Sequence, residues 1–540
     1  MWRWDAIKSK NALMGKLLKI KKKQPDTLPP YDLNDHGSLV EFEVPDGATE
    51  IERYWVDEPF AFVSIFDDSK MLHYYMVEPS LAAYEKAVLD RMYGDLQSIL
   101  ASSYSVSETD MDAVLTRETL ALLKYYHVEL TIASVHKILY YLRRNFRGYE
   151  RLNPVLMDPY IEDISCDGID VPVFLYHRTH RNIRTNIVFG ELDLNSFVIK
   201  LCQKSGKQIS IGEPMVDATM PDGSRIQATL GKEVTTRGSS FTIRKFRGDP
   251  ITPIDLIDFG TCSVGMMAYF WLVIEGGKSI IFAGGTASGK TAILNAVSLF
   301  IPPLTKVISI EDTRELTLHH DNWIAGITRK SFTVSGAGEV TMYDLLRSAL
   351  RQRPEYILVG EVRGSEALTL FQAMSTGHTT YSTMHAGDVP TVVNRLEHDP
   401  INVPHAMMQS LDIICIQAQT YVNEKRARRT QTIVEIAGLD PKTGNIRVNE
   451  LYRWEPTADM FKRTCESSVL NGIIKTRGWT PDKLFGELAN RVTILEHMRQ
   501  KGMGDYVIVS LVVQAYATNP ELVMSAVETD RLQELISENK

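Results

Sequence analysis

The feature that most constrains the fold of this chain is an eight-residue motif that matches the pattern G-x-x-x-x-G-K-[ST]. The apolar residues 279–283 before it are typical of a buried strand, and residues 291–301 after it have the pattern of a helix that ends before Pro302. A strand, a glycine-rich turn and a helix in this order form a phosphate-binding loop. The sequence therefore predicts a nucleoside triphosphate site made by Gly284, Gly285, Thr286, Ala287, Ser288, Gly289, Lys290 and Thr291.

Each part of this motif has a chemical role in holding phosphate. Backbone N–H groups of such a turn point inward and donate hydrogen bonds to phosphate oxygens. Lys290 supplies positive charge to the outer phosphates, and the hydroxyl of Thr291 is a ligand for Mg²⁺. ATP and Mg²⁺ are therefore the expected cofactors.

The composition narrows the class of protein. With 540 residues, 44% of them hydrophobic, the chain can form two or three domains. Its net charge of −8 argues against a surface that follows nucleic acid, so no nucleic-acid partner is expected. Five cysteines without a C-x-x-C pair fit a reducing cytoplasm better than a disulfide framework or a zinc site. We recognise no apolar stretch long enough to span a membrane and no signal peptide, so any membrane contact is expected to be peripheral.

Four regions are expected along the chain. Residues 1–34 are a basic segment and a proline-containing linker, in which 1–23 form either a basic amphipathic helix or a solvated terminus. Residues 35–150 are an acidic N-terminal extension domain that becomes helical in its second half, and 151–250 are a small α/β domain rich in short strands. Residues 251–540 alternate strands and helices, as in a parallel sheet covered by helices, and end in helices. The predicted fold class is α/β.

Two acidic residues follow strands downstream of the motif. Glu311 follows the strand-like segment 306–310, and Glu361 comes shortly after the apolar run 356–359. Because the carboxyl ends of parallel strands face the ligand crevice, both side chains are expected near the phosphates. We interpret Glu311 as the base that activates water and Glu361 as the residue that organises Mg²⁺. The sequence also allows these two roles to be exchanged, and it allows Glu311 to be only a turn cap.

Two histidines flank the next strand-like segment. His378 precedes residues 379–384 and His385 follows them. Taken singly, each is more often a structural histidine than a functional one. A histidine near a γ-phosphate can donate a hydrogen bond to it, and the short distance in sequence from Glu361 favours this sensing role for both.

In this order the motifs resemble those of the secretion ATPase superfamily, the motors of type II and type IV secretion, type IV pili and archaella. The family's four boxes match the G-x-x-x-x-G-K-T motif, I-E-D at 310–312, R-P-x-Y-I-L-V-G-E at 353–361 and S-T-G-H at 375–378. The stretch P-D-G-S-R at 221–225 resembles part of the family's N-terminal domain. Within the family, residues 51–61 resemble the archaeal branch, in which the closest match is the archaellum motor ATPase or a sister pilus ATPase.

The resemblance implies a RecA-like P-loop ATPase core, a smaller α/β N-terminal domain and a helical N-terminal extension, assembled as a homohexamer. Arg225 and Arg244, with Arg237 as a third choice, are the arginines carried over as completing the nucleotide site. The implied partners are an integral-membrane platform protein and an accessory regulatory ATPase. The implied location is the inner face of the cell membrane, where residues 1–23 would approach anionic lipid or the platform protein.

The expected function is therefore ATP-driven assembly or rotation of an archaellum or a type IV pilus-like filament. Three alternatives stay open at this point: conjugative or other type IV secretion, translocation of nucleic acid on the same core, and a scaffold that binds ATP without hydrolysing it. The acidity of the chain disfavours the second alternative, and the acids at Glu311 and Glu361 disfavour the third.

Overall fold

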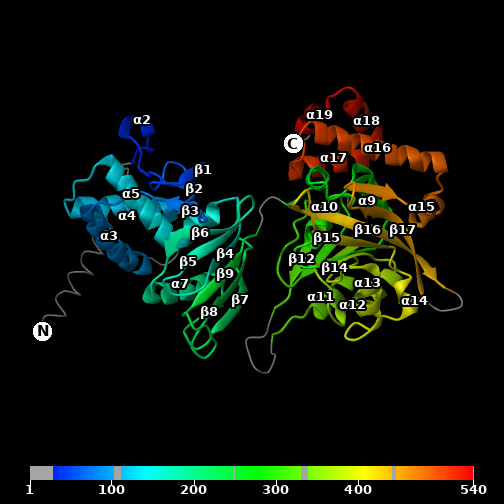
Figure 1. Cartoon of the computed structure of the whole chain (residues 1–540), viewed down its shortest axis with the longest axis horizontal. Coiled ribbons are helices and arrows are strands. Elements are labelled where there is room, and N and C mark those ends of the chain that lie inside the picture. The colour runs from blue at the N-terminus through cyan, green and yellow to red at the C-terminus, as the bar shows by residue number, and fades with distance from the viewer. Residues whose placement is uncertain (1–27, 103–110, 247–249, 330–337, 441–444, 539–540) are drawn as a thin grey trace. The chain divides into compact units, whose positions relative to one another are not determined.

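The computed structural model describes residues 28–102, 111–246, 250–329, 338–440 and 445–538. The chain divides into two compact units, 1–246 and 247–540, each with its own sheet and helices (Figure 1). This boundary lies close to the one expected at residue 250. The basic segment 1–23, for which an amphipathic helix was one prediction, lies outside the described residues.

The first unit is built on a nine-stranded sheet in the order β1-β2-β3-β6-β5-β4-β9-β8-β7. Its strands are β1 Thr49–Asp57, β2 Ala61–Asp67, β3 Leu72–Val77, β4 Ile161–Cys166, β5 Pro172–His177, β6 Arg181–Val188, β7 Met215–Thr219, β8 Arg225–Thr229 and β9 Ser240–Arg244. Its helices are α2 Leu33–His36, α3 Ala83–Ser102, α4 Met111–Tyr125, α5 Ile132–Phe146, α6 Asn153–Met157 and α7 Glu191–Lys204, with a 3₁₀ turn at Glu150–Leu152.

This sheet crosses the boundary that we expected at residue 150. β3 pairs in parallel with β6, so the strands of the acidic extension continue the sheet of the α/β region. Val63 and Ile65 of β2 also share one apolar core with Ile164 and Phe241. An unpaired strand edge exposes backbone N–H and C=O groups, and this pairing covers the edge of β6. The helices α3, α4 and α5 pack around a core of their own, as expected for a helical extension.

The second unit contains a nine-stranded sheet in the order β12-β11-β13-β14-β10-β15-β16-β17-β18. The first six strands of this order are parallel, and β15 to β18 form antiparallel hairpins. The strands are β10 Ile280–Gly284, β11 Val307–Glu311, β12 Trp323–Ile327, β13 Tyr356–Val359, β14 Thr379–Met384, β15 Ile413–Val422, β16 Lys425–Leu439, β17 Ile446–Glu455 and β18 Met460–Arg463. The RecA-like, mostly parallel fold class is confirmed, whereas the antiparallel hairpins were not predicted.

Helices cover both faces of the parallel part of this sheet. Ile280 and Phe282 of β10 belong to the core shared with α9 and α10, whereas Ile281 and Ala283 belong to the core shared with α11 to α14 (Figure 1). A strand buried on both faces has a continuous apolar sequence, which is why β10 was recognisable. The helices of the unit are α8 Pro253–Asp258, α9 Val264–Glu275, α10 Lys290–Ser298, α11 Met342–Leu350, α12 Glu366–Ser375, α13 Val389–Glu397, α14 His405–Met408, α15 Ser468–Arg477, α16 Pro481–Gln500, α17 Tyr506–Thr518, α18 Pro520–Glu528 and α19 Leu532–Glu538.

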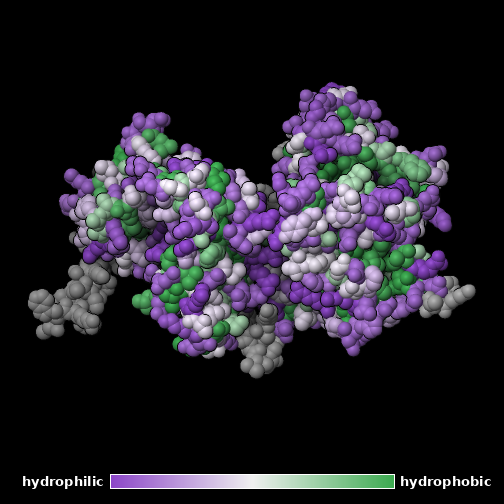
Figure 2. Space-filling view, in the orientation of Figure 1, coloured by the Kyte–Doolittle hydropathy of each residue, from purple (hydrophilic) through white to green (hydrophobic). Residues whose placement is uncertain are grey.

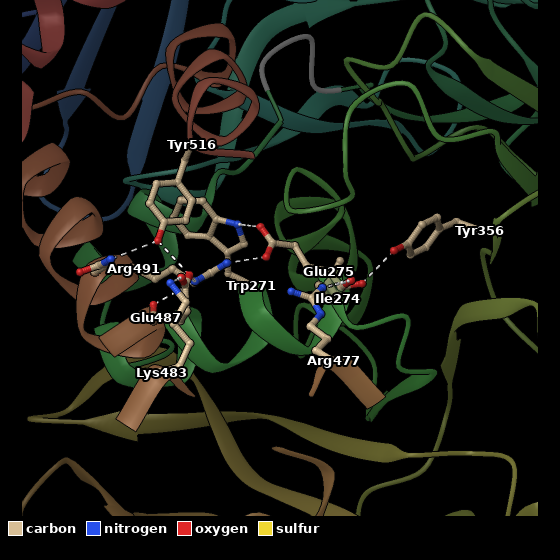
Figure 3. A network of polar contacts seen from close by, with 10 residues as sticks. Trp271, Ile274, Glu275, Tyr356, Arg477, Lys483, Glu487, Arg491 and Tyr516 are labelled. Atoms are coloured by element: carbon tan, nitrogen blue, oxygen red, sulfur yellow. Dashed lines mark hydrogen bonds and ion pairs between the residues drawn. The ribbon is translucent and has the colours of Figure 1, made fainter. Parts of the chain in front are cut away.

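A buried polar network connects the C-terminal helices to α9 (Figure 3). The side chain of Arg491 on α16 is 3% exposed and forms ion pairs with Glu275 at the end of α9 and with Glu487 one turn earlier on α16. Trp271 donates its indole N–H to Glu275 over 2.8 Å. The guanidinium of Arg491 also lies over the rings of Trp271 and Tyr516, at 5.4 and 5.0 Å from the ring centres.

On the face shown in Figure 2, hydrophilic residues cover much of each unit, and smaller hydrophobic areas are interspersed among them. None of the helices in the described part of the chain combines the length and the apolar character needed to cross a bilayer.

Candidate nucleotide site

The predicted phosphate-binding loop leads from β10 into α10, and its backbone requires glycine at two positions. At Gly284, a Cβ atom would lie 2.3 Å from the carbonyl oxygen of Gln417 and 2.4 Å from the hydroxyl of Ser288, so a side chain has no room there. Gly289 caps α10 with a φ of +92°, in the left-handed region that glycine favours. Ala287 also has a positive φ, of +58°. The loop therefore has the tight turn that presents successive backbone N–H groups to an anion.

Lys290 opens α10 and folds back over the loop. Its ammonium group donates to the carbonyl oxygen of Gly285 over 2.9 Å, and the hydroxyl of Ser288 donates to the same oxygen over 2.9 Å. Burial lowers the pKa of Lys290, while the nearby carboxylates of Glu361 and Glu315 oppose this shift. The lysine of the loop thus lies in the field of the predicted acid Glu361.

Hydrogen bonds align the ends of three neighbouring strands with this loop. The N–H of Gly360, which follows β13, donates to the carbonyl of Ile310 in β11 over 2.9 Å. The hydroxyl of Thr383 in β14 donates to the carbonyl of Gly360 over 2.6 Å. β14 in turn pairs with β10, with Met384 level with Ala283. Glu311 and Glu361 therefore lie at the same sheet edge as the phosphate-binding loop, as the topology predicts for carboxyl ends of parallel strands.

Glu311 is a buried carboxyl group with one unpaired oxygen. Its residue is 2% exposed, and one oxygen accepts hydrogen bonds from the N–H groups of Glu315 and Leu316 over 2.9 and 3.0 Å. The other oxygen has no hydrogen-bond partner among the described residues. Burial raises the pKa of Glu311 to about 7, although the two backbone N–H groups act in the opposite direction. One oxygen therefore caps the turn, and the other is left for a proton or a water.

Glu361 is a more accessible carboxylate than Glu311. Its side chain is 23% exposed and forms an ion pair with Arg363, two residues further along the chain. Thr291 is half-buried in the first turn of α10, next to Lys290. Hydroxyl and carboxylate oxygens are the ligands that Mg²⁺ prefers. Because Thr291 follows Lys290 directly and the Glu361 carboxylate lies near the Lys290 ammonium group, the residues present fit a nucleotide with its Mg²⁺.

The two predicted histidines lie at opposite ends of β14. His385 follows Met384 and is exposed at the carboxyl end, level with the start of the phosphate-binding loop. His378 precedes Thr379 at the other end, where its ring nitrogen lies 3.2 Å from the hydroxyl of Thr376 and 3.3 Å from the carbonyl of Ala373. A strand rises about 3.3 Å per residue, so the two histidines are roughly 20 Å apart. Only His385 lies at the same sheet edge as the phosphate-binding loop, and the sensing role of the two histidines stays a prediction.

Arg225 and Arg244 belong to the first unit and lie side by side there. They are directly opposite each other in the antiparallel pair β8 and β9. Arg225 forms a bidentate ion pair with Asp217, with N–O distances of 3.2 and 2.8 Å. Next to Arg244, the ammonium group of Lys245 donates to the carbonyl of Asp158 over 2.5 Å. Arg225 and Arg244 are thus neighbours on the sheet, each next to a carboxylate, Asp217 and Asp163 respectively, and their role at a nucleotide stays a prediction.

One residue that contacts the loop was not predicted from the sequence. Arg428 of β16 donates from its Nε atom to the carbonyl of Ala287 over 3.0 Å. The sequence signal for the hairpin that carries Arg428 is the dipeptide Asn423-Glu424, which lies between two segments of alternating apolar and polar residues. A two-residue turn that contains Asn is typical of a β-hairpin. Both residues of this turn have positive φ values, 48° and 64°.

Comparison with known proteins places this site in a family. Residues 198–459 match the family model of the type II/IV secretion system proteins, and residues 8–80 match the model of PilB3-like N-terminal regions. The uncharacterized protein MJ0900 of Methanocaldococcus jannaschii is 39% identical over 394 residues, which cover 72% of this chain and 71% of that protein.

More distant relatives include named secretion proteins. The type IV secretion system protein PtlH of Bordetella pertussis is 32% identical over 261 residues, 42% of this chain and 76% of PtlH. The X-ray structure of the Legionella pneumophila ATPase DotB matches with a TM-score of 0.38 and 16% identity, covering 66% of this chain and 93% of DotB. The sequence relatives and the family model decide the assignment, and the chain belongs to the type II/IV secretion system protein family.

Proposed function

We propose that this protein is a Mg²⁺-dependent ATPase that works as a homohexameric motor for an archaellum or a type IV pilus-like filament. The observation that carries the ATPase assignment is the position of Lys290, Glu311 and Glu361 at one edge of one sheet. ATP binding and hydrolysis need a phosphate cradle, a cation and an acid that can take a proton, and this edge supplies all three.

The residues of the site have separate roles in this proposal. The loop N–H groups and Lys290 bind the phosphates, and Thr291 and Glu361 hold the Mg²⁺. When bound, the metal neutralises part of the phosphate charge that develops during phosphoryl transfer. Glu311 orients a water molecule and takes its proton on the unpaired oxygen. His385 donates a hydrogen bond that depends on the γ-phosphate.

Phosphoryl transfer also needs positive charge from outside the loop, and we assign this role to Arg225 and Arg244. These arginines lie on the first unit, so their approach to the nucleotide depends on how the units assemble. The match of residues 8–80 to PilB3-like N-terminal regions supports a filament machine as the output. The partners in this proposal are an integral-membrane platform protein and an accessory regulatory ATPase. The protein would act at the inner face of the membrane, with anionic lipid contacting residues 1–23.

The relative PtlH favours a second candidate, a secretion motor without a filament. The experiment that separates the candidates is affinity purification of the full chain from its own cells, followed by identification of the membrane protein that co-purifies. A platform protein encoded with filament subunits supports the filament motor, and a secretion-channel component supports the alternative. Native mass spectrometry of the same sample with a non-hydrolysable ATP analogue tests the hexamer, and a monomer under these conditions contradicts it.

Glu311 makes the rate of hydrolysis depend on pH. Its carboxyl has a pKa of about 7 and must be deprotonated to accept a proton from water. As the pH falls below 7 the active form is lost, so kcat/KM, which reports groups of the free enzyme, should decrease about tenfold for each pH unit well below 7 and level off above it. The measurement is phosphate release across this pH range. The residual rate of Glu311→Gln should lack this inflection, and a wild-type profile that is flat through pH 7 would exclude Glu311 as the base.

A further inference from the structure

The hairpin of β15 and β16 extends past the sheet edge at which the phosphate-binding loop lies. β15 is parallel to β10 and pairs with it as far as Gly284 and Gln417. From there β15 continues to Val422, and β16 returns from Lys425, with the two strands paired along this whole projection. The hairpin therefore lies beside the loop, on the opposite side of β10 from β14.

Arg428 is the hairpin residue that reaches the loop. Its Nε atom donates to the carbonyl of Ala287 over 3.0 Å. Its Cδ atom lies 3.3 Å from the position that a Cβ of Gly289 would occupy, so the side chain passes close over the loop. The contact connects residues 141 positions apart in the chain. The contact is made to Ala287, the one non-glycine residue of the loop with a positive φ. A positive φ is an unfavourable backbone conformation for alanine, and the hydrogen bond from Arg428 helps to stabilise it.

The neighbouring arginines have other partners. Arg429 is buried and forms a bidentate pair with Asp459, at 2.7 and 2.8 Å. Arg426 donates to the hydroxyl of Tyr421 over 3.2 Å. Arg428 uses one of its five N–H donors on Ala287, and within the described residues its other four have no hydrogen-bonded acceptor. Arg428 is exposed, so its remaining N–H donors and its positive charge are accessible beside the loop.

We propose that Arg428 binds the phosphate groups of ATP held by the loop of the same chain, as a second cation besides Lys290. This inference rests on the proposed function, because it deepens the description of the same site. A guanidinium offers several N–H donors in a fixed plane and pairs strongly with phosphate oxygens. The contact with Ala287 holds the guanidinium at the loop before ATP arrives, which reduces the entropy lost on binding. Arg428 is thus a binding residue that couples the hairpin to the occupancy of the site.

The test is calorimetric titration of the full chain with AMP-PNP and Mg²⁺. Arg428→Ala should weaken binding about tenfold or more, the effect typical of losing a charge-assisted hydrogen bond. Arg428→Lys keeps the charge and should recover part of the affinity, whereas the neutral Arg428→Gln should not. The matched control is Arg426→Ala on the same hairpin, which should bind as the wild type does.

Tripolyphosphate, titrated in the same way, should lose affinity in Arg428→Ala by a similar factor, because it presents phosphate without base or ribose. Wild-type affinity in Arg428→Ala, or rescue by Arg428→Gln equal to that by Arg428→Lys, would overturn the inference and leave Arg428 as a loop cap. The variant Lys290→Ala and the wild type distinguish a failure of this inference from a failure of the proposed function. If Lys290→Ala loses AMP-PNP binding and Arg428→Ala does not, only the inference fails; if the wild type does not bind, the proposed function fails.

Discussion

Replacing Lys290 with alanine is expected to reduce ATP hydrolysis by about 10³-fold or more. The ammonium group is positioned by the carbonyl of Gly285 at 2.9 Å and lies near the carboxylate of Glu361. Without it, the outer phosphates lose the cation that neutralises them in both the bound state and the transition state. The loop backbone and the acids at the strand ends cannot supply this charge. The measurement is phosphate release under saturating ATP and Mg²⁺, together with the affinity for AMP-PNP.

The matched control for this variant is Lys278→Ala. Lys278 precedes β10 at the opposite end of the same strand, where it forms an ion pair with Asp412 at 3.1 Å. Its removal affects the far end of the strand and should leave turnover per folded molecule close to that of the wild type. Equal losses in both variants would indicate general destabilisation, and wild-type turnover in Lys290→Ala would refute the site.

The parts of the site that the sequence predicted are those encoded locally. β13 and β14 have the predicted bounds, Tyr356–Val359 and Thr379–Met384. The loop before Lys290 also has the expected strand and helix around it. In each case a short apolar run and a glycine-rich or acidic ending specify the element without reference to any distant residue. The carboxyl ends of parallel strands then meet at one edge of the sheet, and Glu311, Glu361 and the loop all lie at that edge.

Local sequence patterns did not predict how segments far apart in the chain lie relative to one another. His378 and His385 are close in sequence, but one strand separates them, and only the pairing of Met384 with Ala283 shows which end of β14 faces the loop. Arg428 contacts Ala287 because β15 happens to lie next to β10, and an adjacency of strands is not visible in periodicity. The pairing of β3 with β6 is a further long-range choice. Register and strand order depend on tertiary packing, which local patterns do not determine.

The network around Arg491 makes the C-terminal helices sensitive to a single substitution. Glu275 and Glu487 are each 11% exposed in their side chains and share this one guanidinium. Burial raises the pKa of Glu487, but hydrogen bonds from Lys483 and Arg491 outweigh that effect and hold the pKa at about 2. Glu487 is therefore ionised at neutral pH although its side chain is largely removed from water. Taking away the cation leaves buried negative charge, which is more costly than losing the ion pair at the surface.

Arg491→Leu is accordingly expected to destabilise the second unit by about 3 to 5 kcal/mol at neutral pH. The measurement is urea unfolding of the full chain, with hydrogen exchange of α9 and α16 to identify the transition that belongs to this unit. The control is Arg499→Leu on the same helix, whose ion pair with Asp258 is half-exposed and should contribute about 1 kcal/mol or less. A similar loss in both variants would contradict the role of the network.

The pH dependence of stability provides the sharper test of the same network, because Glu487 should titrate in this range only in the variant. In the wild type, Glu487 with its pKa of about 2 stays ionised and paired between about pH 8 and about pH 5, so its contribution does not change there. In Arg491→Leu the pKa of Glu487 should rise, because Arg491 no longer lowers it while burial still raises it, so acidification protonates this carboxyl in the folded state and removes part of the penalty. The difference in unfolding free energy between the two proteins should therefore narrow as the pH falls through this range. A constant difference would mean that the lost packing against Trp271 and Tyr516, and not the uncompensated charge, accounts for the destabilisation.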